Sequence, residues 1–577
     1  MSSSPPVAAG GGHVLARAVR GGSYRFLQRL LTFAANSFVL RRLQLSVTGA
    51  VTVRLELALA SIFLLRDGFR LAFLRMPSLD ATPSSSSSSS RLQQLVNVAW
   101  ISTAISWGVA SLVLAYTALS EPSETEDDAI LAGYPTVLAM YCGAAMIEAL
   151  AEPMFVLAHA SVLVSWQVAA QSAAFLVRAA VQYVGVVLLD LNLTAYGIAE
   201  LAYALTLLSM FAAFFWRRIQ TSEANGGFAL TRMGQLLPGK PEDGATWCHA
   251  ELMTLLVPLA VQSGVKYLLA EGDKWVLTGF ASLHHMGIYG LVSNLGSLVP
   301  RIVFLPIEEA TKTIFSKLAT AQKQQNSDAK DNESKRTSMT EAKTLLLVLL
   351  KLMNLVGLLF VCFGTSYART LVLLLYGAEK ARQGVGGALA VYCIYIPFLG
   401  INGVCEAVVH AVGDDRQLMR LNKVLGVFFA VYAFSALVFM QLLDWGTTGL
   451  ILANCVNMSC RILYCLVFLA SYFGREDPTS KSGSGVLKGL AFWRQSLPDN
   501  LVVTAFLASM VVTATSQHLL LIEDSAKSTP WTRHVLHVGM GAVCFACVLL
   551  TLFVKERKLL GAQLSALRGQ QSKPHHD

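Results

Sequence analysis

Charged residues are scarce in this chain of 577 residues, since Asp, Glu, Lys and Arg make up only 14% of it. An ordinary soluble domain carries about 25%. Apolar residues supply 54%, and runs of about 20 of them, the length that a helix needs to cross the hydrocarbon core, recur along the sequence. The composition therefore excludes an ordinary soluble domain and predicts an all-α polytopic membrane protein.

Motifs of nucleotide-driven and hydrolytic chemistry are absent as well. The chain has no G-x-x-x-x-G-K-[ST] phosphate loop, no H-E-x-x-H, and no G-x-S-x-G among soluble α/β signals. We therefore do not expect nucleotide-driven pumping by this chain alone, and we expect no cofactor.

Cysteine is present, but it is not grouped in any loop outside the predicted spans. All ten cysteines lie in or beside apolar runs, so a disulfide framework is not expected. Cys544 and Cys547 form the sequence CFAC. No second cysteine pair accompanies them, so we interpret them as small core residues and predict no metal site.

Fourteen apolar spans can be placed along the chain. Their predicted limits are 24–45, 46–65, 94–119, 130–153, 161–189, 195–216, 250–270, 275–303, 344–366, 386–411, 424–443, 446–473, 500–521 and 534–554. Basic residues concentrate in alternate connections, which by the positive-inside rule places both termini in the cytosol, although Arg41 and Arg42 fit poorly. Basic cytosolic segments account for the net charge of +9. They attract anionic lipid headgroups, and no nucleic-acid partner is expected.

Several ionisable residues fall inside the apolar spans. Glu148 and Glu152 are four residues apart in IEALAEPMF, so both carboxylates share one helical face and repel each other, and Pro153 follows directly. A charge at the bilayer centre costs about 2.5 to 3.5 kcal/mol, so such residues usually face a cavity or one another. Arg54 and Arg461 fall near mid-span. Arginine donates two parallel hydrogen bonds to phosphate, which makes these two candidate phosphate ligands.

Charges also gather at one predicted face of the membrane. The two glutamates of span four lie at its cytosolic end, and span eight ends on the same side at RIVFLPIEEA, which contains Arg301, Glu308 and Glu309. Arg29 of span one and Glu406 of span ten are expected there too. This grouping favours an inner gate closed by ion pairs, and simple solvation of the helix ends is the alternative.

Several stretches of the chain resemble the Rft family of endoplasmic-reticulum proteins, within the multidrug, oligosaccharidyl-lipid and polysaccharide exporter superfamily. They are NSFVLRRL, VTVRLELAL with LRDGFR, IEALAEPMFVLA, EGDKWVLTGF running into GIYGLVSNLGSLVPRIVFLPIEEATKTIFSKL, INGVCEAV and GLILANCVNMSCRI. The resemblance implies two six-helix bundles around a central cavity, with two further C-terminal helices. It also implies a substrate: a dolichol diphosphate bearing five mannoses and two N-acetylglucosamines, which reaches the lumen for protein N-glycosylation.

The resemblance and the spans together give the expected organisation. It consists of a cytosolic tail at 1–23, a first bundle at 24–216, a cytosolic linker at 217–249, a second bundle at 250–473, a cytosolic loop at 474–499, two additional spans within 500–554 and a cytosolic tail at 555–577. The substrate-binding candidates are Arg29, Arg54 and Arg461. The gate or cavity candidates are Glu148, Glu152, Glu271, Arg301, Glu308, Glu309, Asn402 and Glu406.

Two other functions remain open at this point. The chain could act without transport, as a chaperone or channelling factor that delivers the same glycolipid to lumenal enzymes. It could also be an ion-coupled exporter of organic cations that uses the buried acids as cation sites, although the mid-span arginines Arg54 and Arg461 argue against this. The expected partners are the glycolipid and membrane lipids.

The inner gate predicts a specific pair, Glu152 with Arg301. Each single charge reversal, Glu152→Arg or Arg301→Glu, is expected to reduce N-glycosylation in cells that depend on this chain, and the double swap is expected to restore it. Cysteines at the two positions should form a crosslink. If neither rescue nor crosslink is observed, the two residues are not gate partners.

Overall fold

A computed structural model of the chain describes residues 36–75, 86–119, 133–160, 164–225, 232–241, 246–325, 332–474, 485–522 and 531–571. Nearly all of these residues are helical, and none of them lies in a strand. The chain folds into two compact units, Met1–Gly290 and Leu291–Asp577. The predicted limits of the bundles and their linker remain predictions.

The polytopic membrane fold is confirmed. Within the described residues, twelve helical segments are long and apolar enough to span a membrane, and a bent pair, Tyr134–Leu150 with Glu152–Ala158, makes a thirteenth if it is one span. The expected count of fourteen is not confirmed, because most of the predicted first span at 24–45 lies outside the described residues. Ten of the other predicted spans coincide with single observed segments to within a few residues or a few turns.

The predicted break between spans seven and eight is wrong by about three turns. The sequence suggested an end at 270, yet the first helix runs over Ala250–Phe280 and the next span over Leu283–Thr320. The charges that suggested the break are paired inside the first unit: Lys274 lies 3.0 Å from Glu56 and 2.9 Å from Glu271. Local hydropathy cannot show partners that are distant in the sequence. The charged residues were therefore interpreted as a loop between two spans.

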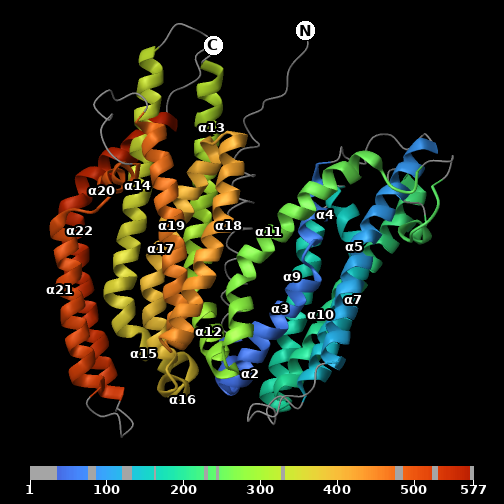
Figure 1. The fold of residues 1–577 in the computed structure, drawn as a ribbon, viewed down its shortest axis with the longest axis horizontal. Coiled ribbons are helices and arrows are strands. Elements are labelled where there is room, and N and C mark those ends of the chain that lie inside the picture. The colour runs from blue at the N-terminus through green and yellow to red at the C-terminus, as the bar shows by residue number, and fades with distance from the viewer. Residues whose placement is uncertain are drawn as a thin grey trace. The chain divides into compact units, whose positions relative to one another are not determined.

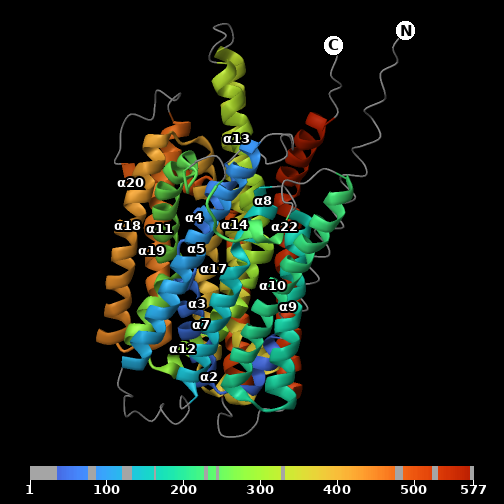
Figure 2. The same cartoon turned by 90° about the vertical axis from the view of Figure 1, so that its right-hand side faces the viewer.

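The first unit is a group of long helices with short broken ones. Its helical elements are α2 (Leu45–Gly49), η2 (Ala50–Leu55), α3 (Glu56–Ile62), α4 (Arg66–Leu74), α5 (Ser86–Leu119), α7 (Tyr134–Leu150), α8 (Glu152–Ala160), α9 (Val164–Tyr183), η3 (Val184–Leu188), α10 (Asn192–Asn225), η4 (Met233–Leu236), α11 (Ala250–Phe280) and the start of α12 (Leu283–Gly296). The long helix α10 packs along α7 and α9, and α5 packs along α7 (Figure 2). Buried Phe155, Phe211 and Phe215 belong to the core between these helices.

The second unit is built around α17 (Val385–Val412), the most buried of the described spans. Its other helical elements are η6 (Pro300–Phe304), α13 (Leu305–Gln325), α14 (Asn332–Leu359), η7 (Phe360–Gly364), α15 (Thr365–Tyr376), α16 (Ala378–Arg382), α18 (Asp415–Leu437), η8 (Val438–Leu442), α19 (Gly446–Phe473), α20 (Gly485–Arg494), α21 (Asn500–Gln517), η10 (His518–Ile522) and α22 (Trp531–Gln571). Helices α13, α14, α15 and α19 all contact α17.

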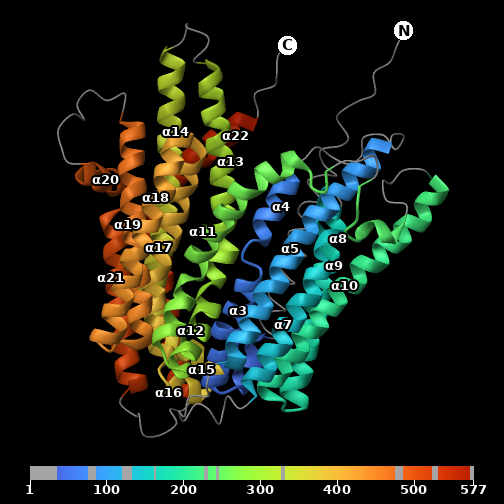
Figure 3. The same ribbon diagram turned by 45° about the vertical axis from the view of Figure 1, so that its right-hand side comes forward.

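The helices of the second unit are not equally long or equally central. The last two membrane helices, α21 and α22, form a neighbouring pair at one edge of the unit (Figure 1). Helices α13 and α14 extend beyond the others at one end (Figure 3).

A close approach of two backbones depends on glycines in the first unit. A Cβ atom added to Gly287 of α12 would overlap the carbonyl oxygen of Leu45, and one added to Gly49 would overlap that of Leu283. Small residues allow membrane helices to pack at short range, where van der Waals contact rather than the hydrophobic effect holds them together. The contact fixes the start of α12 against α2.

Replacing Gly287 with alanine should therefore destabilise the protein. Overpacking of this kind costs about 1 to 3 kcal/mol, and the thermal unfolding temperature of the purified protein in detergent should fall. Gly279→Ala is the matched control, because a Cβ atom there would meet nothing within 4 Å. Equal unfolding temperatures for the two variants would contradict the proposed close packing.

Candidate functional site

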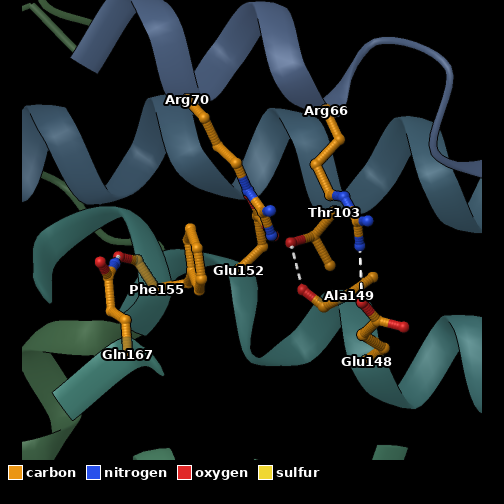
Figure 4. Close-up of polar contacts among 8 residues, drawn as sticks. All are labelled: Arg66, Arg70, Thr103, Glu148, Ala149, Glu152, Phe155 and Gln167. Atoms are coloured by element: carbon orange, nitrogen blue, oxygen red, sulfur yellow. Dashed lines mark hydrogen bonds and ion pairs between the residues drawn. The ribbon is translucent and has the colours of Figure 1, made fainter. Parts of the chain in front are cut away.

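The glutamate pair of the first unit lies at a break in a membrane helix. Helix α7 ends at Leu150 and α8 begins at Glu152, with a bend of 42° between them. In an unbroken helix the carbonyl oxygen of Ala149 would accept a hydrogen bond from residue 153, but Pro153 has no N–H. Thr103 of α5 donates its hydroxyl to that oxygen instead, at 2.8 Å (Figure 4). The break is thus stabilised by a neighbouring helix.

Both glutamates are paired with arginines of α4. Arg66 donates through Nη1 to Glu148 Oε1 at 2.6 Å, and Arg70 donates through Nε and Nη2 to the two oxygens of Glu152, each at 2.7 Å (Figure 4). The second pair is a bidentate fork, the strongest geometry for these groups. We call Arg66, Arg70, Glu148 and Glu152 the first charge cluster.

The first charge cluster is largely removed from solvent. The side chains of Glu148 and Glu152 are 11% and 5% exposed, and those of Arg66 and Arg70 are 22% and 20% exposed. Each guanidinium also stacks on an aromatic ring: Arg66 lies 3.9 Å from the centre of Phe63 and Arg70 lies 3.7 Å from that of Phe155. The two arginines and two glutamates therefore give the first charge cluster no net charge, and water has little access to it.

The arginines of this cluster were missed at the sequence level. They lie in RDGFR, between two apolar runs, and were assigned to a cytosolic connection. The available signal was their spacing, because Arg66 and Arg70 are four residues apart, as Glu148 and Glu152 are, and two helices with matching intervals can pair twice. The expected pair of Glu152 with Arg301 combines residues of different units and stays a prediction.

The second unit contains a corresponding cluster around Arg461, which lies near the middle of α19. Arg461 of α19 donates through Nη2 to Glu406 Oε2 of α17 at 2.6 Å. Asn402, one turn earlier on α17, donates to the same oxygen at 3.0 Å, and His410 lies 3.7 Å from the other carboxylate oxygen. We call Asn402, Glu406 and Arg461, with Glu308, the second charge cluster.

Glu308 joins this cluster through a glycine. A Cβ atom added to Gly403 would overlap the carboxylate of Glu308, so the glutamate of α13 lies directly against the backbone of α17. Gly403 directly follows Asn402 and lies three residues before Glu406 on that helix. The structure therefore brings together four residues that were selected from the sequence, one as a substrate ligand and three as gate or cavity residues.

The remaining candidates belong to neither charge cluster. Arg54 is on the π-helical segment η2, near the middle of Leu45–Ile62. Its Nε is buried and has no hydrogen-bond partner among the residues that the structure describes. Glu271 pairs with Lys274. Arg301 and Glu309 are exposed residues of η6 and α13, and Arg29 lies outside the described residues. The roles assigned to all these residues in binding or gating remain predictions.

Removing Arg70 should be costly, because Glu152 would remain buried without its counterion. Breaking a buried pair from one side costs about 3 to 5 kcal/mol, so Arg70→Ala should unfold at a clearly lower temperature. The double reversal Arg70→Glu with Glu152→Arg should recover most of the loss. Arg75→Ala is the control, since Arg75 is an exposed residue at the end of the same helix. An Arg70→Ala variant as stable as the control would show that the fork does not hold α4 in place.

Comparison with known proteins identifies the family. A family model described as Rft protein matches residues 23–565. The Man(5)GlcNAc(2)-PP-dolichol translocation protein RFT1 of Xenopus tropicalis is 32% identical over 564 residues, which cover 95% of this chain and 97% of the relative. The protein of the same name from Mus musculus is 31% identical, over 96% of this chain and 97% of its own length.

Solved structures show the same fold at much lower identity. The lipid II flippase MurJ in an inward closed conformation aligns over 94% of this chain and all of its own, with a TM-score of 0.55 and 13% identity. A multidrug resistance MATE family transporter in an inward-facing conformation aligns over 78% of this chain and 96% of its own, with a TM-score of 0.50 and 13% identity. The matches to the family model and to its curated relatives extend over almost the whole sequence, and the chain belongs to the Rft protein family.

Proposed function

We propose that this chain carries a dolichol-diphosphate-linked heptasaccharide, five mannoses on two N-acetylglucosamines, from the cytosolic to the lumenal side of the endoplasmic-reticulum membrane. The product is used in protein N-glycosylation. The names of its relatives, which cover nearly all of both chains, support this substrate. The chain is then a flippase-like transporter rather than an enzyme, with both termini in the cytosol.

The observation that carries the proposal is a pair of arginines deep in the spans. Arg461 lies near the middle of α19, and its Nη2 is bonded to Glu406. Within the described part of the chain, its Nε is buried and has no hydrogen-bond partner, and the same holds for Nε of Arg54 near the middle of its own span. A buried donor without an acceptor is costly. A diphosphate supplies acceptors of the required charge, and an organic cation does not.

Glu406 gives Arg461 a counterion while no diphosphate is bound. Carboxylate and phosphate oxygens accept the same forked hydrogen bonds from a guanidinium, so an arriving diphosphate competes with Glu406 for Arg461. Asn402 and His410 remain beside the released carboxylate. The exchange keeps the arginine paired at every stage, and this avoids the cost of an isolated charge inside the membrane.

Reconstitution of the purified full chain in lipid vesicles tests the proposal. The authentic glycolipid is supplied on one side, and a lectin or glycosidase that cannot cross the membrane reports its appearance on the other side. We expect translocation to be faster than in protein-free vesicles. Tight glycolipid binding without faster translocation would contradict transport and would favour the channelling alternative.

Arginine variants identify the phosphate ligands within the same assay. Arg54→Ala and Arg461→Ala should each lower glycolipid affinity about tenfold or more, the size expected for one hydrogen bond to a charged group. Arg420→Ala is the control, since Arg420 is an exposed residue of α18. Arg54→Lys should bind less well than the native chain if a planar fork is required. Unchanged affinity in both alanine variants would remove these arginines from the site.

A further inference from the structure

A second cationic place lies in the second unit, away from the charge clusters. It is a cavity of about 480 Å³ between the first turns of α15, the end of α16 and the start of α17, and the end of α21 closes one side. Its lining residues are Thr365, Arg369, Ala381, Arg382, Gly386, Gly387, Ala390 and Gln517. Helices α15 and α16 lie at the same end of this unit in Figure 1. Nothing in the proposed translocation uses this cavity.

The charge of the cavity is positive and unbalanced. Arg369 and Arg382 are its only ionisable lining residues, and no acid contributes to the lining. Within the described part of the chain, neither arginine forms an ion pair, including with Glu379, which lies three residues before Arg382 on α16. Gln517 adds a side-chain amide. Two unpaired guanidinium groups around one hollow form a suitable site for an anion.

Glycines give the cavity its room. A Cβ atom added to Gly386 would lie 3.0 Å from the Cα atom and 3.2 Å from the Cβ atom of Arg369, so the arginine packs closely over bare backbone. A Cβ atom added to Gly387 would meet nothing within 4 Å. Side chains at these positions would crowd Arg369 or occupy the hollow. The backbone of Gly386 and Gly387 in the first turn of α17 therefore forms one wall of the cavity.

The cavity lies close to the end of a membrane span. Arg369 lies seven residues before Tyr376, where its span ends, which is roughly 10 Å along the helix. An arginine at that depth reaches the headgroup region. Basic pockets between membrane helices bind anionic lipid headgroups.

We infer that this cavity binds the phosphate of an anionic lipid headgroup, with Arg369 and Arg382 as its ligands. In the proposed orientation the bound lipid belongs to the lumenal leaflet. The site stands on its own residues, and it holds whether or not the chain translocates a glycolipid.

Binding to the purified full chain in detergent tests the inference directly. The probes are dioctanoyl phosphatidic acid, inorganic phosphate and, as a lipid without net charge, dioctanoyl phosphatidylcholine. Phosphatidic acid should bind and raise the unfolding temperature, while the other two bind at least about tenfold more weakly. Equal affinity for inorganic phosphate would show a site for free anions and would overturn the lipid assignment.

Three variants locate the site. Arg369→Ala and Arg382→Ala should each weaken phosphatidic acid binding about tenfold. Gly387→Leu should weaken it strongly without changing any charge, because a Cβ atom there meets nothing within 4 Å and the longer side chain would occupy the hollow. Arg420→Ala, at the exposed start of α18, should bind as the native chain does. Native affinity in Gly387→Leu and in both arginine variants would overturn the inference.

Discussion

A charged side chain inside the hydrocarbon core needs a counterion, because neither lipid nor a satisfied helix backbone can solvate it. The polar architecture of both units follows from this constraint. In the first unit, Arg70 holds Glu152 in a fork beside the break of a helix. In the second, Arg461 holds Glu406 between two continuous helices. The same rule thus applies beside a helix break in one unit and between two unbroken helices in the other.

The cations of the molecule differ in depth and in pairing. Those near the middle of a span or at a helix break are mostly held by carboxylates, as Arg461 is by Glu406. Arg369 and Arg382 lie near the end of a span and have no carboxylate partner among the described residues. Deep cations are therefore suited to exchanging one anion for another, and those near the membrane surface to holding an anion supplied by the membrane.

The sequence alone shows which charged residues are costly to place inside the membrane. It does not show which residues pair with them and offset that cost. Arg461 and Glu406 stand out in apolar runs, and the structure pairs them. Arg66 and Arg70 do not stand out, because they lie between apolar runs and gain meaning only when α4 packs beside α8. Lys274 looked like the end of a span for the same reason. A counterion 82 or 218 residues away along the chain leaves no local trace.

The long intervals between partners also have a consequence for biosynthesis. Arg66 and Arg70 leave the ribosome 82 residues before Glu148 and Glu152, and at about 5 to 20 residues per second this is a delay of roughly 4 to 16 s. Thr103 also emerges before the proline whose missing hydrogen bond it replaces. During this delay the two arginines of α4 lack the two glutamates that pair with them in the folded protein. Segment α4 should therefore stay hydrated, at the interface or inside the insertion machinery, until α7 arrives and its membrane position can become permanent.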